Sequence, residues 1–197
     1  MTCIVSIVKD GVVYIGGDRG ISDEISIMPL LLPKVAIRGM WIYGYAGSLG
    51  NGQLFDFIDL PDIKKTDDVY SILRMDVVEN YKSILDTHGS DKEADSTDFI
   101  IGCNGRLFEF NTDGWGVAEI SECSIGSGSS FALGSLYTSI DKEPIERIGL
   151  ALGAAITYSP TCQGPIDIFI HDDASRHGCY TTVIKLLYKC DVLSHRH

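Results

Sequence analysis

Three residues near the start of the chain carry groups that could cooperate in nucleophilic catalysis, namely Thr2, Asp18 and Lys34. Methionine before a small residue is usually trimmed, and loss of Met1 would leave Thr2 with a free α-amine beside its own hydroxyl. An α-amino group has a reference pKa of about 7.7–8.0, so near neutral pH much of it is unprotonated and can accept the hydroxyl proton. We therefore expect that Thr2 can act as a nucleophile with its own amine as the base.

Asp18 and Lys34 have the charges that such a nucleophile requires. A nearby cation lowers the proton affinity of the amine, and a carboxylate keeps that cation oriented. Each residue taken alone has a simpler interpretation. Thr2 would be a solvated terminal residue, Asp18 a turn former and Lys34 a charge at a strand edge. Their joint spacing favours the catalytic interpretation. Cys3 is a weaker nucleophile candidate, because it lacks a free amine and its side chain should lie on the opposite strand face from Thr2.

Strand signals surround these residues. Two runs rich in β-branched residues flank the turn at Lys9-Asp10-Gly11, and a second pair flanks Arg38-Gly39. Asp18 then lies at the end of the second strand, beside the start of the first, and Lys34 opens the third. Both residues can reach Thr2 without long loops. The predicted strands in this half of the chain are 2–8, 12–16, 34–37 and 40–46.

The pattern then changes to a helical period. Apolar residues recur on one helix face over 67–86, and two further helices are predicted at 129–139 and 144–158, the last with Pro144 in its first turn. Between them, a loop over 88–98 leads to a hairpin over 99–110 with Asn104-Gly105 at its turn. Strands at 165–170 and 179–188 and a frayed tail at 194–197 complete the prediction.

The order of elements is strands, helices, strands, helices, strands, joined by antiparallel hairpins without βαβ alternation. This order favours an α+β layered fold over a doubly wound sheet. We find no internal repeat or linker, so residues 1–197 are expected to form a single domain.

Composition excludes several function classes. The net charge of −11, with no dense Lys/Arg cluster, argues against nucleic-acid binding. The chain has no membrane-length apolar run and no secretory leader, so we expect a cytoplasmic protein without a membrane partner. The six cysteines form no CxxC pair and are expected to be reduced and mostly buried.

The catalytic candidates also resemble a known family. Thr2, Gly17-Asp18, Lys34, the GYAGS run at 44–48 and Gly126-Ser127-Gly128 are similar to the motifs of proteasome β-subunits, including the bacterial HslV peptidase. These proteins are threonine-type N-terminal nucleophile hydrolases. Asp18 follows Thr2 by sixteen positions and Lys34 follows Asp18 by sixteen, as in that family. The resemblance implies a four-layer αββα sandwich of antiparallel sheets.

The resemblance assigns a role to each matching residue. It implies that Thr2 is the nucleophile, that Lys34 lowers the proton affinity of the site, and that Asp18 pairs with Lys34. The backbone N–H of Gly47 would be an oxyanion donor, and Ser127 would complete the polar network beside the terminal amine.

Substrate contacts are implied in the same way. The pocket for the residue before the cleaved bond would be lined by Ile21, Leu32, Ala36 and Tyr45, which predicts a preference for uncharged side chains. Ser22 would offer its backbone to an extended peptide.

The sequence also departs from the family. Arg19 follows Asp18 directly, whereas the family often has Arg two residues after the Asp. Ser159 and Cys162 stand where related subunits have an Asp and a Ser.

The leading prediction is an endopeptidase that forms an acyl-enzyme ester through Thr2 and needs no metal or organic cofactor. By the resemblance, it would assemble with itself into a ring that encloses the active sites, with an ATP-driven unfoldase as a partner that delivers polypeptide substrates. Three alternatives stay open. They are a catalytically silent ring subunit that retains Met1, an amidase of the same class acting on a small amide, and a non-enzymatic binding module.

Two local motifs have simpler explanations. The GSGSS run at 126–130 lacks the Gly-Lys-Ser/Thr ending of a phosphate-binding loop and is interpreted as a glycine-rich entry to a helix. His171-Asp172-Asp173 and the HRH tail have no His pair at helical ligand spacing, so no metal site is predicted.

Overall fold

The computed structural model of the protein describes residues 2–22, 26–89, 96–172 and 180–186. Two five-stranded antiparallel sheets form its centre, with strand orders β10-β1-β2-β11-β12 and β5-β6-β7-β8-β9. The first sheet contains β1 (Ile4–Lys9), β2 (Val12–Asp18), β10 (Glu122–Ile125), β11 (Ile166–Asp172) and β12 (Tyr180–Leu186). The second contains β5 (Val35–Arg38), β6 (Trp41–Gly47), β7 (Thr97–Cys103), β8 (Arg106–Asn111) and β9 (Val117–Ile120). A separate ribbon pairs β3 (Gly20–Ser22) with β4 (Ile27–Pro29).

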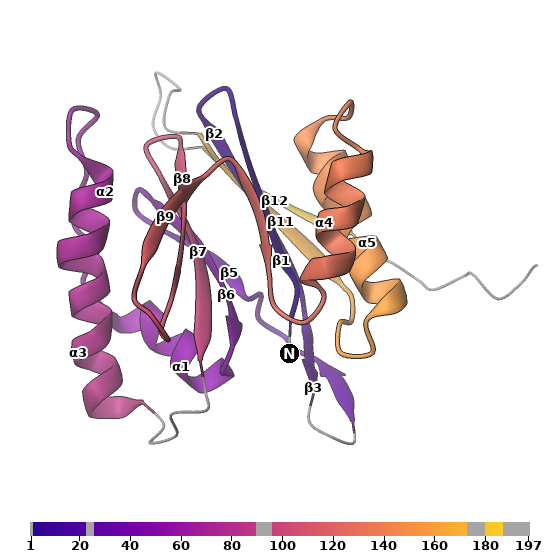
Figure 1. Ribbon diagram of the computed structural model, residues 1–197, viewed down its shortest axis with the longest axis horizontal. Helices are drawn as coiled ribbons and strands as arrows, with labels where there is room; N and C mark the ends of the chain where they lie inside the picture. Colours follow the sequence, from indigo (N-terminus) through magenta and orange to yellow (C-terminus); the bar gives the residue numbers. More distant parts are fainter. Residues whose placement is uncertain (1, 23–25, 90–95, 173–179, 187–197) are drawn as a thin grey trace, which may run out of the picture.

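Helices cover the outer face of each sheet (Figure 1). On the β5–β9 sheet lie α1 (Leu49–Leu54), η1 (Phe55–Phe57), and a continuous rod of α2 (Val69–Ile72), the π-helical η2 (Leu73–Val77) and α3 (Val78–His88). On the other sheet lie α4 (Ser129–Thr138) and α5 (Pro144–Tyr158). The layers are therefore helix, sheet, sheet, helix. This confirms the predicted αββα sandwich.

Three apolar cores hold the four layers together. An aromatic core joins the β5–β9 sheet to α1, α2, η2 and α3, and includes the stacked pair Phe99 and Phe110 with ring centroids 4.8 Å apart. An aliphatic core joins the other sheet to α4 and α5, with Ile148 and Leu152 of α5 fully buried. The third core lies between the two sheets and includes the buried Ile4.

Glycines allow the two sheets to approach closely. A Cβ added to Gly44 of β6 would lie 3.0 Å from the Ile4 side chain of β1, and one added to Gly102 of β7 would lie 2.6 Å from Val13 of β2. Real Cβ atoms do not pack at the shorter distance. The close contact therefore depends on glycine, and it brings β1 and β2 next to β5, which begins just after Lys34, and β6, which ends at Gly47.

The predicted hairpins are present, with the residue types that tight turns need. Asp10-Gly11 and Asn104-Gly105 both have positive φ at the two turn positions, with values of 53°, 77°, 51° and 67° in chain order. Two-residue turns with this geometry match the twist of antiparallel strands and favour Asn or Asp followed by Gly.

Several boundaries differ from the prediction. The first strand begins at Ile4 rather than residue 2, because the Cys3 N–H bonds to the Asp18 carboxylate and the Thr2 carbonyl accepts from Gly128. The helix predicted over 67–86 spans 69–88 with a π-helical turn, so the predicted loop at 88 starts too early. The prediction missed β3, β4, α1, β9 and β10. Part of the last predicted strand and the 194–197 tail lie outside the described residues.

Among the helices of the described residues, none is both long enough and apolar enough to cross a membrane.

Candidate active site

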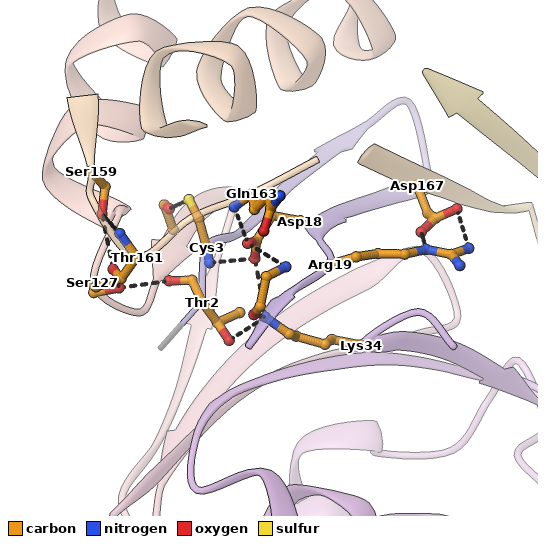
Figure 2. A network of polar contacts seen from close by, with 12 residues as sticks. Thr2, Cys3, Asp18, Arg19, Lys34, Ser127, Ser159, Thr161, Gln163 and Asp167 are labelled. Atoms are coloured by element: carbon orange, nitrogen blue, oxygen red, sulfur yellow. Dashed lines mark hydrogen bonds and ion pairs between the residues drawn. The ribbon is translucent and has the colours of Figure 1, made fainter. Parts of the chain in front are cut away.

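Thr2 lies immediately before β1, at the junction of the two sheets, and is 4% exposed. Its Oγ1 accepts a hydrogen bond of 2.6 Å from Nζ of Lys34, the residue just before β5. Figure 2 shows these side chains meeting from different sheets. The sandwich therefore places an ammonium group directly on the hydroxyl that the sequence identified as the nucleophile.

Asp18, the last residue of β2, is fully buried and binds four donors (Figure 2). Its carboxylate accepts from the backbone N–H groups of Cys3 (2.9 Å), Gly20 (2.9 Å) and Gln163 (3.0 Å), and from Lys34 Nζ at 3.2 Å. The three backbone donors hold the carboxylate in place independently of Lys34. Asp18 is thus a rigid anchor for the Lys34 ammonium.

Lys34 sits between the carboxylate and the Thr2 hydroxyl in a nearly dry environment. Lys34 is 4% exposed, and its amine also donates to the carbonyl of Gly20. Burial lowers the pKa of the Lys34 amine from its ordinary value, and the charge and hydrogen bond of Asp18 oppose that effect. A buried ammonium with a lowered pKa favours negative charge on the neighbouring Thr2 oxygen and can itself give up a proton more readily than an exposed lysine.

Ser127 belongs to a chain of hydroxyl groups on the other side of Thr2. Its Oγ donates to the Thr2 carbonyl at 3.4 Å and lies 2.7 Å from Thr161 Oγ1, which is 3.0 Å from Ser159 Oγ. Gly128 N–H also donates to the Thr2 carbonyl, at 3.3 Å. The loop before α4 therefore binds the Thr2 carbonyl. The hydroxyl groups of Ser127, Thr161 and Ser159 extend from there toward the end of α5.

Gly126 explains why this loop needs glycine. Its φ is +92°, and a Cβ there would lie 2.2 Å from the Thr2 carbonyl oxygen and 3.0 Å from the Ala46 Cβ. The end of β6 thus passes beside the Thr2 backbone. The next residue, Gly47, is exposed, has φ of +110°, and would carry a Cβ 2.2 Å from the Ser96 carbonyl oxygen. A residue with a side chain could not keep this backbone conformation.

An apolar cavity of about 480 Å³ opens beside the β3–β4 ribbon. Ile21, Leu32 and Tyr45, three of the four predicted pocket residues, line it. Ala36 packs against the aromatic core, and Ser22 ends β3 in register with Ile27. The complete lining consists of Ile21, Met28, Pro29, Leu30, Leu31, Leu32, Pro33, Tyr45 and Gln53.

Arg19 connects this cavity to the rest of the site, a contact that the sequence analysis did not foresee. Its guanidinium forms a bidentate pair with Asp167, including Nη2 to Oδ1 at 2.8 Å, and also donates to the Leu31 carbonyl. The Leu30 N–H donates to the Arg19 carbonyl at 2.8 Å. Arg19 therefore fixes one wall of the cavity to β11.

Gln163 and Thr161 were also missed. Gln163 acts on Asp18 through its backbone N–H, which no side-chain pattern can reveal. Thr161 bridges Ser127 and Ser159, and only the alignment of Ser159 and Cys162 with the family's polar positions could have drawn attention to this segment. Within the described ranges, no group of three or more His, Cys, Asp or Glu side chains could hold a metal ion.

Comparison with solved structures supports the predicted fold. BPH from Thiobacillus denitrificans, in complex with epoxomicin, aligns with a TM-score of 0.74 and 20% identity over 88% of this chain and 100% of that one. Eukaryotic HslV from Trypanosoma brucei aligns with a TM-score of 0.63 and 18% identity, over 86% and 98%. An Anbu (Gly-1) mutant from Hyphomicrobium sp. strain MC1 aligns with 0.70 and 15%, over 94% and 88%.

No family model and no curated protein sequence matches the chain. The structural likenesses show that the chain has the αββα fold of HslV and proteasome-like proteins.

Proposed function

We propose that this chain, which has the proteasome-like fold, is a threonine-type endopeptidase whose nucleophile is Thr2 Oγ1, exposed for catalysis by removal of Met1. The observation that carries the proposal is the position of Lys34 Nζ, 2.6 Å from Thr2 Oγ1 and 3.2 Å from Asp18 Oδ1. The Lys34 ammonium has three N–H donors, and Thr2 Oγ1 accepts the one that the Asp18 carboxylate and the Gly20 carbonyl leave.

The first half of the reaction would form an ester. The free α-amine of Thr2 takes the proton from Oγ1, the Lys34 charge stabilises the developing alkoxide, and the oxygen attacks the substrate carbonyl. The Gly47 N–H would donate to the oxyanion that forms. The protonated α-amine then gives its proton to the departing substrate amine as the C–N bond breaks, which leaves the acyl group on Thr2.

The second half would release the product. The α-amine, neutral again, takes a proton from a water molecule that attacks the ester carbonyl, and the same proton returns to Oγ1 as the C–O bond breaks. Ser127, with Thr161 and Ser159 behind it, lies against the Thr2 backbone and would orient the terminal amine. The α-amine of Thr2 gains and loses one proton in each half, so the site ends the cycle in the charge state in which it began.

Substrate preference follows from the cavity beside β3 and β4. Its lining is almost entirely apolar, which favours an uncharged side chain before the cleaved bond. Ser22 at the end of β3 would pair through its backbone with an extended peptide. We expect a panel of fluorogenic peptides to show faster cleavage after uncharged residues than after acidic or basic ones.

The assembly is part of the proposal. We infer a cytoplasmic, ring-forming homo-oligomer that receives polypeptides from an ATP-dependent unfoldase. The support is the shared fold with the structures named HslV and Anbu, the latter also described for Yersinia bercovieri as an ancestral beta-subunit. Exposed apolar side chains on α4, on the turn after it and on α5 also favour self-association.

The deciding experiment is the intact mass of purified protein with and without a peptide boronate or epoxyketone. We expect loss of one methionine and a stable adduct at Thr2. The matched variants are Thr2→Ala, which should form no adduct and hydrolyse no peptide, and Thr2→Ser, which keeps a hydroxyl and should retain part of the activity. Retained Met1 in an assembled protein would support a silent subunit, and undiminished proteolysis by Thr2→Ala would refute the proposed nucleophile.

A further inference from the structure

Two cysteines lie together directly behind the nucleophile. Cys3 follows Thr2 in the chain, and Cys162 precedes Gln163, whose N–H binds Asp18. Both belong to the core between the β1–β2 sheet and helices α4 and α5, where Cys3 is 0% and Cys162 5% exposed. Both are free thiols. The mechanism proposed above uses neither of them.

Gly128 leaves space for the two cysteine side chains, which both lie against it. The position that a Cβ on Gly128 would take lies 2.9 Å from Cys3 Cβ and 2.7 Å from Cys162 Sγ. Two cysteines that lie against the same glycine are near enough for a small movement to bring their Cβ atoms to the separation of about 3.5–4.5 Å that a disulfide needs.

The two cysteines also hold opposite sides of the same carboxylate. Cys3 N–H donates to Asp18 Oδ1 at 2.9 Å, and the residue after Cys162 donates to Oδ2 at 3.0 Å. Asp18 in turn anchors Lys34. A covalent bond between the two sulfurs would therefore join the two chain segments that together position the Thr2–Asp18–Lys34 cluster.

The surroundings of Cys162 favour its reactive thiolate form. The neighbouring Cys3 thiol lowers the pKa of Cys162 to about 7, with further help from the hydroxyls of Ser159 and Ser127 and with burial and Asp18 opposing. The Cys162 thiol, together with burial, raises the pKa of the Cys3 thiol. The pair therefore has one thiolate able to react first and one thiol positioned to react second.

We propose that Cys3 and Cys162 form a reversible disulfide when the protein meets a peroxide. The Cys162 thiolate attacks one peroxide oxygen, breaks the O–O bond, and becomes a sulfenic acid as hydroxide leaves and is protonated to water. The Cys3 sulfur then attacks the Cys162 sulfur and displaces its hydroxyl, which leaves as a second water with the Cys3 proton. The two thiols are oxidised by two electrons and the peroxide is reduced to two waters. A dithiol reductant reverses the reaction.

The expected consequence is reduced activity, and this part rests on the proposed function. A disulfide brings two sulfurs to about 2.05 Å, closer than two unbonded thiols can approach. The Cys3 segment must shift toward the Cys162 segment, and Thr2 is the adjacent residue. Because misplacement of a reacting group by about 1 Å can cost roughly 100-fold in rate, we expect peptide hydrolysis to fall at least about tenfold and to recover with dithiothreitol.

The cross-link can be tested without any activity. Reduced protein is treated with stepwise amounts of hydrogen peroxide, its remaining thiols are alkylated, and it is digested with trypsin without reduction. Each of the six cysteines falls on a different tryptic peptide, with Cys3 in 2–9 and Cys162 in 148–176. We expect these two peptides to be linked, with loss of two hydrogen atoms, and to separate after dithiothreitol.

Variants sharpen the result. Cys3→Ser and Cys162→Ser should each abolish the link and the peroxide sensitivity. Cys123→Ser is the matched control, because Cys123 donates to Glu109 at 3.3 Å and burial raises its pKa to about 12. It should oxidise at the pair as the wild type does.

Outcomes that refute the pair are distinct from those that refute the peptidase. Peroxide that converts Cys162 to sulfinic acid, or that links another pair first, would overturn the disulfide. A link that forms without lowering an existing peptidase activity would overturn its regulatory effect. A link that forms in a protein with no peptidase activity would confirm the disulfide and count against the proposed function alone.

Discussion

At the scale of single residues, Asp18 and Lys34 contribute unequally to the fold. Asp18 binds three backbone N–H groups as well as the lysine, whereas Lys34 binds one carboxylate, one hydroxyl and one carbonyl. Asp18→Ala leaves a buried ammonium and three buried N–H donors without their acceptor. We expect a loss of about 3–5 kcal/mol in the free energy of unfolding.

Lys34→Met is the contrasting variant. Its carboxylate partner keeps three backbone donors, and methionine fills the volume of the lysine stem, so the expected loss is smaller, about 1–2 kcal/mol. Urea denaturation of both variants measures the difference. Equal losses would show that Asp18 does not organise the site. Activity should be abolished in both.

Lys34 also predicts a dependence of stability on pH. Burial lowers the pKa of this amine in the folded protein, so just below pH 10.5 the unfolded chain binds more protons than the folded one. Stability contributed by this site therefore rises with pH over that interval. The free energy of unfolding of the wild type, minus that of Lys34→Met, should increase as pH is raised toward 10.5. Subtracting the variant removes the shared effect of buried tyrosines.

Gly47 provides a third test at this scale. Alanine there would need φ of +110° and would place Cβ 2.2 Å from the Ser96 carbonyl oxygen. We expect Gly47→Ala to cost at least about 2 kcal/mol in stability and, if its N–H serves as the oxyanion donor, roughly 100-fold in hydrolysis rate. Gly39→Ala is the control, because Gly39 has φ of +58° with open space around it and should cost only about 1 kcal/mol.

The sequence predicted the side chains of the site better than its backbone partners. Thr2, Asp18 and Lys34 were found by spacing, and the structure brings them into direct contact. Gln163 contributes a backbone N–H, which any residue type could supply, so no pattern indicated it. Arg19 was noted for its unusual place, but its contacts with Asp167 and the Leu31 carbonyl depend on how three distant segments meet.

At the scale of elements, glycine controls the distance between the sheets. A Cβ on Gly102 of β7 would lie 2.6 Å from Val13 and 2.8 Å from Ile42, both stiff β-branched side chains. We expect Gly102→Ala to lower the free energy of unfolding by about 1–3 kcal/mol. Gly134→Ala in α4 meets nothing within 4 Å and should be neutral or stabilising by up to about 1 kcal/mol. Thermal or urea denaturation compares them, and equal effects would contradict close sheet packing.

Elements with strong local signals were predicted, and those created by tertiary contacts were not. The hairpins at Asp10-Gly11 and Asn104-Gly105 carry their own turn chemistry. Helix α1 contains two glycines, which disfavour helix, yet Gly52 is required because a Cβ there would lie 2.0 Å from the Tyr45 ring. Strands β9 and β10 are separated only by Ser121 and belong to different sheets. A run of local sequence gives no sign of that change of sheet.

At the scale of the whole molecule, one outer helix layer has an apolar surface. Tyr137 of α4 is 81% exposed and Ile140, in the turn after it, 75%. Other exposed apolar side chains in this layer are Phe131, Leu133, Leu150 and Tyr158. Exposed apolar side chains gathered on one face are typical of protein–protein contacts. This apolar surface on α4 and α5 therefore supports the proposed self-association.

We expect Tyr137→Glu combined with Ile140→Glu to shift the protein toward smaller species in sedimentation velocity. Met75→Glu, at a position that is 66% exposed on the opposite helix layer, is the matched control. A wild-type protein that sediments as a monomer at micromolar concentration would contradict the assembly. Equal dissociation by the control would place the interface elsewhere.

The burial of Thr2 also guides the preparation of the protein. Its carbonyl is held by Gly128 and Ser127, its hydroxyl by Lys34, and only 4% of the residue is accessible. An affinity tag fused to the amino end would be attached to the backbone nitrogen of Thr2 or of Met1 before it. It would therefore block the α-amine that the proposed chemistry requires. Recombinant versions should therefore carry their purification handle at the carboxyl end, or behind a cleavable leader whose removal exposes threonine.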